Sequence, residues 1–293
     1  MSSNKTVLIG LIAISAGLGA LAFARYDAAH YGVPGFGIWK VISGQSRGAD
    51  HADVNGVRIY YETFGAGPPV LVMHGGLGRL EDMHYQIADL AAKHLVIAPD
   101  SRGHGRSSDV VGPLHYADMS DDMVGLLDRM HVESADLVGW SDGGIVALDL
   151  AMRHPDRVRR VVVIGGNSDP SGLVALPAEA PVQAADVSVT GDAYRKISPT
   201  PQHWHLLLAR VLTMWRTEPN YTSADLGRIR APVLVIAGEH DAIRRAHTDA
   251  LARAIPGARE VIVLGASHLA PMENPIAVDK AILSFLNPPP PKP

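Results

Sequence analysis

Short runs of β-branched and other apolar residues alternate with amphipathic stretches along most of the chain, and this alternation constrains the fold more than any other feature. Several of these runs are apolar at every position, which is typical of a parallel strand buried on both faces. Strands that alternate with helices predict an α/β fold with a mostly parallel central sheet and helices on both faces. The predicted strands are Val57–Thr63, Val70–Met73, Leu95–Ala98, Ala135–Val138, Val158–Ile164, Val233–Ala237 and Arg259–Leu264.

Length and composition narrow the classes of protein. A chain of 293 residues can bury a sizeable core as one domain. Its net charge of −4 argues against a nucleic-acid-binding protein, which usually carries a basic surface. The chain has no cysteine, which excludes disulfide scaffolds, thiol nucleophiles and cysteine-ligated metal sites. We therefore expect no cofactor, no metal and no nucleic-acid partner.

The N-terminus carries an uncharged apolar segment of 18 residues, Val7–Ala24, flanked by Lys5 and Arg25. As a helix it would be roughly 27 Å long, close to the ~30 Å hydrocarbon thickness of a bilayer. Ala22-Phe23-Ala24 also has the small-x-small pattern that signal peptidase reads. The sequence leaves a membrane anchor and a cleaved signal peptide open, with a buried core helix as the third alternative. Either of the first two predicts an extracytoplasmic protein, periplasmic or secreted.

The remaining boundaries follow from composition. Residues 25–52 are rich in small residues, and their apolar residues do not recur with a helical or strand period. We predict a tether or surface arm there. One folded domain is expected over residues 53–287, and residues 288–293 form a proline-rich tail. Within the domain, the alternation breaks between about 167 and 229, where prolines and aromatic residues concentrate. A long structureless loop is improbable there, so we predict an inserted lid that supplies pocket walls.

Gly139-Trp140-Ser141-Asp142-Gly143 has the G-x-S-x-G pattern and lies directly between a predicted strand and a predicted helix. A serine on such a sharp turn exposes its hydroxyl at the carboxyl edge of the sheet. The glycines leave room for the turn, and the helix N-terminus favours the negative charge of a tetrahedral intermediate. The pattern predicts that Ser141 is a nucleophile.

A serine nucleophile needs a base. His268 follows the last predicted strand in a short loop, which is where the base falls when the chain order is serine, acid, histidine. His74 and His104 lie in glycine-rich turns and are expected to be structural. His203 and His205 form the one pair that resembles a metal site, but residues two apart do not share a helix face and no carboxylate is near them in sequence.

The acid of a triad orients the imidazole and balances its positive charge. Asp241 follows the predicted strand Val233–Ala237 and lies between Ser141 and His268 in the chain. Asp169 is the alternative, because it follows the preceding strand. Glu239 is close to Asp241 but is expected to point elsewhere. The order of the residues favours Asp241.

An oxyanion hole needs two backbone donors. The amide of Asp142, directly after the predicted nucleophile, is one. The other is expected from the turn H-G-G-L-G, at Gly76 or, second, at Leu77, because missing side chains let a backbone N–H approach the substrate. This turn lacks the lysine of a phosphate-binding loop, so nucleotide binding is not expected. Further side chains expected in the pocket or lid are Leu77, Trp140, His203, Trp204 and Trp215.

Five segments together resemble the α/β-hydrolase superfamily, and within it the esterase and lactonase branch that includes valacyclovir hydrolase-like and enol-lactonase-like proteins. The match runs from about Val57 to Leu286, whereas the segment before Asp53 lies outside the shared fold and the lid is short. The segments are MHGGLG, APDSRGHGRSS, LVGWSDGGIVALDLAMRHPDRVRRVVVIGG, PVLVIAGEHD and GASHLAPMENP. The resemblance implies a catalytic triad of Ser141, Asp241 and His268, with Gly76 and Asp142 at the oxyanion hole.

These motifs predict a serine hydrolase that cleaves a carboxylic ester or lactone through an acyl-enzyme. Aminopeptidase or amidase activity and C–C bond hydrolysis use the same triad and stay open. Asp142 could also place a carboxylate near the acyl pocket and favour an α-ammonium group. A non-catalytic binding protein on the same fold is the remote alternative. The acyl and alcohol groups of the substrate and the oligomeric state do not follow from the sequence.

Overall fold

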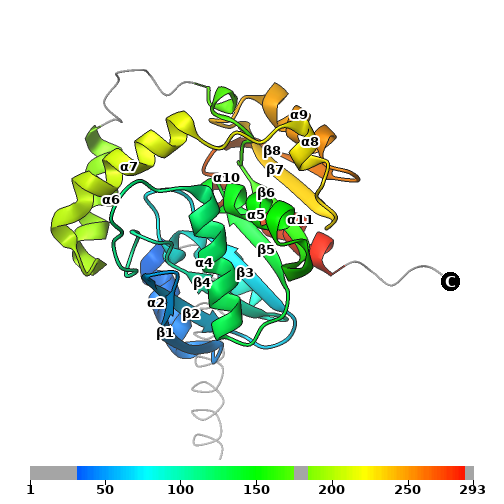
Figure 1. Cartoon of the computed structure of the whole chain (residues 1–293). Coiled ribbons are helices and arrows are strands. Elements are labelled where there is room, and N and C mark those ends of the chain that lie inside the picture. The colour runs from blue at the N-terminus through cyan, green and yellow to red at the C-terminus, as the bar shows by residue number, and fades with distance from the viewer. Residues whose placement is uncertain (1–31, 175–183, 288–293) are drawn as a thin grey trace, which may run out of the picture.

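The computed structural model describes residues 32–174 and 184–287, with the backbone alone for 184–189 (Figure 1). In this part of the chain, eight strands form one sheet in the order β1-β2-β4-β3-β5-β6-β7-β8. The strands are β1 (Ser46–Val54), β2 (Val57–Phe64), β3 (Pro69–Met73), β4 (Leu95–Pro99), β5 (Ala135–Trp140), β6 (Val158–Ile164), β7 (Val233–His240) and β8 (Arg259–Ser267). The seven predicted strands are confirmed as β2 to β8, most of them one to three residues longer than predicted.

Pairing in the sheet is parallel from β4 through β8, and β2 is antiparallel to both β1 and β4. Val138 of β5 aligns with Val72 of β3 on one side and with Val162 of β6 on the other. The carboxyl ends of the parallel strands therefore meet at one edge, where an α/β sheet places its ligands.

Helices cover both faces of the sheet (Figure 1). One face is covered by α4 (Tyr116–Arg129), α5 (Asp142–Arg153), α8 (Ser223–Leu226) and α9 (Arg245–Ala254), and the other by α2 (Gly32–Ile42), α3 (His84–Leu90), α10 (Ala270–Glu273) and α11 (Pro275–Leu286). Short 3-10 turns, η1 (Leu80–Met83), η2 (Pro155–Arg157) and η3 (Pro170–Gly172), join some of the elements. The α/β-hydrolase arrangement of a mostly parallel sheet between two helical layers matches the prediction.

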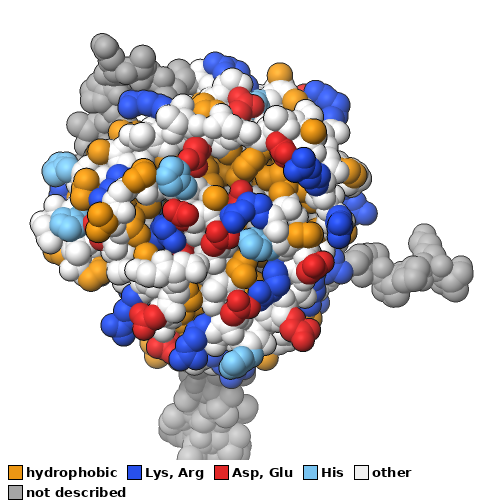
Figure 2. All heavy atoms as spheres, in the orientation of Figure 1, with side chains coloured by type: hydrophobic (Ala, Val, Ile, Leu, Met, Phe, Trp, Pro, Cys, Tyr) orange, Lys and Arg blue, Asp and Glu red, His pale blue; other side chains and the backbone are white. Residues whose placement is uncertain are grey.

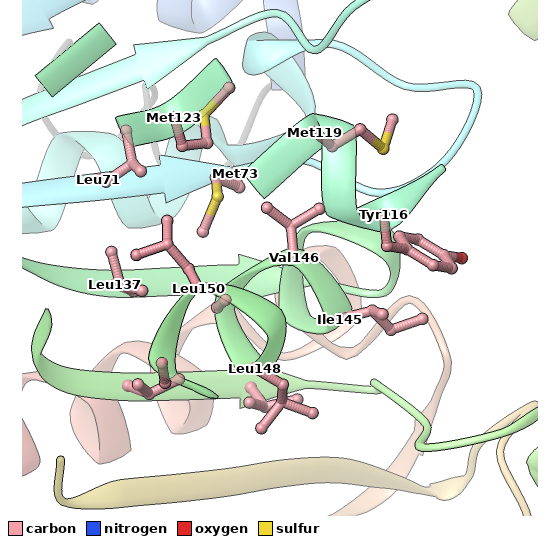
Figure 3. Packing of buried hydrophobic residues seen from close by; sticks show 14 of the residues in the cluster. Leu71, Met73, Tyr116, Met119, Met123, Leu137, Ile145, Val146, Leu148 and Leu150 are labelled. Carbon is pink, nitrogen blue, oxygen red and sulfur yellow. The ribbon is translucent and has the colours of Figure 1, made fainter. Parts of the chain in front are cut away.

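The larger core lies between the sheet and helices α4 and α5. Figure 3 shows Met119 and Met123 of α4 beside Val146 of α5 and Met73 of β3. All four side chains are buried. Because the strand residues are apolar on both faces, the same sheet supports a second cluster under α2, α3 and α11. Helices that pack on both faces of the sheet therefore hold the carboxyl ends of its parallel strands in place.

The prediction of a tether over residues 25–52 is wrong for residues 32–52, which form α2 and most of β1. Strand β1 pairs with β2 through a two-residue turn at Asn55 and Gly56, both with positive φ, at 48° and 77°. Such Asn-Gly turns match the twist of a hairpin, so this dipeptide was the signal for β1. Periodicity failed there because β1 is an edge strand with mostly exposed residues.

The predicted lid over about 167–229 takes the form of a helical cap. It contains α6 (Ala184–Ile197), η4 (Pro201–His203) and α7 (Trp204–Thr217), and α8 follows it. Trp204, Leu207, Val211 and Met214 of α7 are buried against the larger core. The apolar aromatic residues of this stretch therefore fold onto the body of the protein, as an inserted lid requires.

The apolar segment Val7–Ala24 and the tail 288–293 lie outside the described residues. Among the described residues, no helix is both long enough and apolar enough to cross a membrane.

Candidate active site

Ser141 stands at the turn between β5 and α5, with φ 54° and ψ −117°. This backbone conformation is strained for a residue with a side chain. A Cβ on Gly139 would collide with the carbonyl of Gly143, and a Cβ on Gly143 would collide with the carbonyl of Met73. The two glycines of the G-x-S-x-G pattern are thus required by backbone packing, and the turn exposes Ser141 at the carboxyl edge of the sheet.

Three side chains far apart in sequence meet at this edge. Nε2 of His268 lies 3.0 Å from Oγ of Ser141, and Nδ1 of His268 lies 2.7 Å from Oδ1 of Asp241. With the proton on Nδ1, the imidazole donates to the carboxylate and Nε2 can accept the serine proton. The structure therefore brings the predicted nucleophile, base and acid together in the predicted order.

The environment of Asp241 suits a permanent carboxylate. Burial alone would raise the pKa of this carboxyl, but the hydrogen bond from His268 and its charge, with backbone donors from Ile243 and Gly238, hold the pKa below its usual value. An ionised partner stabilises the imidazolium that forms when His268 takes a proton.

The two alternative acids point elsewhere. Oδ1 of Asp169 accepts from the backbone amide of Ser171, and its Oδ2 lies 4.0 Å from Nδ1 of His247 rather than near His268. Glu239 accepts from the backbone amide of Gly265 at 2.8 Å. The geometry favours Asp241, because a carboxylate must contact the imidazole to orient it.

The predicted oxyanion residues Gly76 and Asp142 lie against each other. A Cβ on Gly76 would collide with Oδ2 of Asp142 and lie 2.6 Å from Cζ2 of Trp215. Glycine is therefore required at position 76 by close approach of these side chains. Leu77, the second choice, has a positive φ of 60°, so the turn bends sharply at that residue.

Asp142 carries a buried carboxyl at the start of α5. Its Oδ1 accepts from the hydroxyl of Tyr116 at 2.9 Å and from Nε1 of Trp215 at 2.7 Å. Its Oδ2 is buried without a hydrogen-bond partner among the described residues. Burial raises the pKa of Asp142 to about 6, although the two hydrogen bonds and the charge of His268 oppose the shift. At neutral pH the side chain is mostly a carboxylate, and its buried Oδ2 lacks a hydrogen-bond donor among the described residues.

His74 and His104 are structural, as the sequence predicts. Nδ1 of His74 donates to the carbonyl of Gly75, while Nε2 accepts from the amide of Ser101. Burial lowers the pKa of His74 to about 4 and that of His104 to about 3, so both rings are neutral. A neutral His74 joins the glycine-rich turn to the loop after β4 and fixes the position of Gly76.

A pocket of about 530 Å³ opens above Ser141, which is an ordinary size for a small-molecule site. On the face shown in Figure 2, hydrophobic side chains are visible in a hollow with acidic and basic side chains around it. Several lining residues escaped the sequence analysis, since nothing in their local pattern marks them. The pocket is lined by Tyr116, Ser141, Asp142, Asn167, Leu173, Val174, Trp215, Glu218, His240, Asp241, Ala242, Ile243, Ser267 and His268.

Of the five further side chains predicted for the pocket or lid, Trp215 lines this pocket. The other four are not among its described lining residues. Trp140 is buried, and its Nε1 donates to the carbonyl of His268, so it helps to hold the loop that carries this histidine. Trp204 of α7 is buried within the cap, where its ring packs against Tyr194 of α6, and Leu77 lines a separate cleft.

His203 binds a carboxylate. Its Nδ1 lies 2.6 Å from Oδ2 of Asp109, and Arg210 of α7 donates to Oδ1 of the same aspartate at 2.9 Å. Asp109 therefore holds the cap to the loop after β4, a role that no local pattern in the sequence indicates. In the described ranges, no group of three or more metal-ligating side chains lies together.

Comparison with known proteins shows the family of the chain. A model of the alpha/beta hydrolase family matches residues 70–281. The chain belongs to the α/β-hydrolase family. It is 32% identical to 3-oxoadipate enol-lactonase 2 of Acinetobacter baylyi, over 77% of this chain and 92% of that protein. It is 28% identical to the carboxylesterase YbfK of Bacillus subtilis, over 75% of this chain and 80% of that protein.

A solved structure shows the same fold. The enol-lactonase of Burkholderia xenovorans LB400 superposes with a TM-score of 0.66 at 27% identity, covering 81% of this chain and 99% of that one. The family resemblance inferred from the motifs is confirmed, and the protein is an α/β hydrolase with esterase and lactonase relatives.

Proposed function

We propose that this α/β hydrolase cleaves carboxylic esters or lactones through an acyl-enzyme on Ser141. The observation that carries the proposal is the continuous contact from Ser141 through His268 to Asp241, with distances of 3.0 and 2.7 Å, in a pocket that these three residues line. The enol-lactonase and carboxylesterase relatives support this reaction class.

In this mechanism, His268 accepts the proton of Ser141 as Oγ attacks the carbonyl carbon. The amides of Gly76 and Asp142 donate to the oxyanion of the tetrahedral intermediate, and the dipole of α5 adds to this stabilisation. The imidazolium then gives its proton to the leaving alcohol oxygen. In the second half, His268 takes a proton from water, the hydroxide attacks the acyl group, and Ser141 regains its proton as the acid leaves.

The pocket lining restricts the acyl group. Its walls are mostly apolar, and no lysine or arginine occurs among the described lining residues. Beside the triad, two carboxylates contribute to the lining, those of Asp142 and Glu218. Oε1 of Glu218 lies 2.5 Å from Nδ1 of His115, and Oε2 accepts from the amide of Tyr116. An acyl chain that ends in a carboxylate would face these groups without a cation to pair with, so we expect neutral or cationic acyl groups.

The first test is labelling by a fluorophosphonate, which reacts with activated serines. A mass increase on the peptide that contains Ser141, absent in Ser141→Ala, is the expected result. An unlabelled wild-type protein would mean that the chain is a binding protein on a hydrolase fold.

A panel of p-nitrophenyl esters then tests the acyl group. Three acyl chains of equal length would end in a methyl, a trimethylammonium or a carboxylate group. We expect kcat/KM to be at least about tenfold lower for the carboxylate, and Glu218→Gln to narrow that difference. Equal kcat/KM values for all three esters would contradict the expected selection against a carboxylate on the acyl group. They would not contradict ester hydrolysis itself.

A second candidate is hydrolysis of aminoacyl esters or amides, and it rests on Asp142. Its Oδ2 is buried, is without a partner in the described part of the chain and belongs to a residue next to the nucleophile. A carboxylate there would pair with an α-ammonium group on the acyl part of a substrate. The charged partner would satisfy the one oxygen that Tyr116 and Trp215 leave open.

This candidate is tested by comparing an aminoacyl ester with its desamino counterpart. Wild-type protein is expected to prefer the aminoacyl ester, and Asp142→Asn to abolish the preference while the backbone amide stays in place. The preference should also fall below about pH 6, where Asp142 takes up a proton. Glu218→Gln is the matched control, because it removes a charge from the same pocket at another wall. If the preference survives in Asp142→Asn, the second candidate is wrong.

A further inference from the structure

Helix α2 is apolar on two opposite faces. Phe36 and Trp39 are buried, stack on each other with ring centroids 5.5 Å apart, and both contact Phe64 of β2. On the opposite side of the helix, Ile38 is 57% exposed and Val41 is 83% exposed. At 100° per residue, these two side chains point away from the pair that packs on the sheet. The buried face explains the fold of α2, and the outer face does not contribute to it.

The outer face also lacks polar side chains. Lys40 is the one polar residue in GVPGFGIWKVI. Its Nζ is held by both carboxylate oxygens of Glu62, at 3.0 and 3.1 Å, and lies 5.3 Å from the ring centroid of Phe36. The cation therefore turns toward the body of the protein. A surface helix normally presents charged or polar residues to water, and α2 presents Val33, Ile38 and Val41 instead.

The chain before α2 indicates what this face contacts. Seven residues, 25–31, separate the uncharged segment Val7–Ala24 from Gly32, the first residue of α2. Seven extended residues span at most about 25 Å. A helix tied that closely to a bilayer-spanning segment would be held near the interfacial layer, where apolar side chains of amphipathic helices insert.

We propose that the outer face of α2, formed by Ile38 and Val41, inserts into the interfacial region of a phospholipid bilayer in which Val7–Ala24 is the membrane anchor. The anchor supplies the affinity, and α2 orients the domain on the membrane surface. Burial of the exposed parts of these side chains is favourable at roughly 25 cal/mol per Å² of apolar area. The edge of the sheet formed by β1 and β2 then faces the membrane, and the opposite edge at β8 faces water.

The absence of cysteine from the chain makes a clean experiment possible. Val41→Cys in the full-length protein gives one labelling site for an environment-sensitive fluorophore such as NBD. The labelled protein is reconstituted from detergent into phosphatidylcholine–phosphatidylglycerol vesicles, with and without a lipid that carries a doxyl quencher in its acyl chain. Leu264→Cys is the matched control, since Leu264 is also apolar, is 76% exposed and lies on β8 at the other edge of the sheet.

The expected result is emission at shorter wavelength from position 41 in vesicles, with most of it quenched by doxyl lipid and little by aqueous iodide. The label at position 264 is expected to emit at longer wavelength, to be quenched mostly by iodide and to be quenched little by doxyl lipid. A label at position 41 that iodide quenches as readily as the one at 264 would overturn the proposal. So would a label already shielded in detergent by a second copy of the chain, which dilution would expose.

A variant of the outer face separates orientation from anchoring. Ile38→Ser in the Val41→Cys background is expected to reduce quenching by doxyl lipid at position 41. The protein should remain with the vesicles, and hydrolysis of a water-soluble ester should stay within about twofold of the parent. Unchanged quenching would show that the anchor alone determines the depth of the label, and α2 would then have no role at the membrane.

Discussion

Ser141, Asp241 and His268 stand at the ends of β5, β7 and β8, whereas Trp215 and Glu218 reach the same pocket from the end of cap helix α7. The triad residues are placed by the parallel register of neighbouring strands. The short turns that follow these strands contain glycines at positions where a side chain would collide with the backbone. The second group depends on how an inserted helix pair lies on the body.

The cap is held by buried apolar side chains of α7 and by polar contacts between its side chains and the body. Asp109 binds His203 and Arg210, Asp142 accepts from Trp215, and Glu218 binds His115. These contacts are few, and each joins segments about 70 to 100 residues apart in sequence. The comparison indicates that the body determines whether the chemistry occurs and that the cap determines which substrate is held for it.

The largest effect should come from the body. Ser141→Ala is expected to lower kcat/KM by a factor of order 10³ or more, because the remaining rate rests on oxyanion stabilisation and binding alone. The melting temperature should be nearly unchanged, since the serine hydroxyl is not part of the core and alanine keeps the same backbone conformation. Steady-state kinetics on a p-nitrophenyl ester and a thermal melt check both points. A variant that keeps a tenth of the activity would mean that the nucleophile is another residue.

The acid provides the next test. Asp241→Asn is expected to lower kcat by roughly 10²–10³-fold, since an amide no longer fixes the tautomer of His268 or balances its charge. Asp169→Asn, in the loop after β6, should change kcat less than about threefold, because that carboxylate contacts Ser171 and His247. The reverse ranking would move the acid to β6.

Stability of the body should depend on pH through Asp279 of α11. Burial, together with the nearby charge of Asp89, raises the pKa of this carboxyl to about 8, against the hydrogen bond from Gln86. The folded chain therefore holds the proton more tightly than the unfolded chain. The stability from this group is fully present below about pH 4 and is lost as the pH rises toward 8.

Asp279→Asn removes that titration and can still accept from Gln86. Wild-type protein should lose on the order of 2 kcal/mol of unfolding free energy between pH 6 and 9 through this group, and the variant should not. Urea unfolding at the two pH values measures the difference. Asp192→Asn on the surface of α6 is the control from the cap and should keep the wild-type pH dependence. Parallel curves for wild type and Asp279→Asn would contradict the assignment.

The smallest effect is expected in the cap. Asp109→Ala leaves His203 and Arg210 without their shared carboxylate, so α7 should be held less closely over the pocket. We expect KM to rise about tenfold with kcat within about threefold of wild type, a binding change worth about 1.4 kcal/mol. Asp192→Ala breaks an exposed ion pair with Arg195 and should change neither constant. A fall in kcat that exceeds the rise in KM would show that the cap also positions the triad.

The fold and the triad could be predicted because their signals are local. Apolar runs mark the strands, and the G-x-S-x-G pattern marks Ser141. Asp241 and His268 each lie shortly after a later strand, in the chain order serine, acid, histidine. Two elements near the N-terminus escaped for a physical reason. Strand β1 is exposed, and the buried face of α2 has meaning only against Phe64, which belongs to another element. The Asn55-Gly56 turn was the signal that could have revealed β1.

The pocket was decided by tertiary structure. No local pattern distinguishes Glu218 or Asn167 as wall residues, or Trp204 as a core residue rather than a pocket residue. Their places depend on how α7 packs on the body, which is a sum of many weak contacts between distant segments. Asp142 shows both levels: its position after Ser141 follows from the motif, but the burial that raises its pKa, and the hydrogen bonds from Tyr116 and Trp215 that oppose this shift, exist only in the folded structure. Local backbone requirements are written in short motifs, whereas the shape and charge of a pocket arise only when separate segments meet.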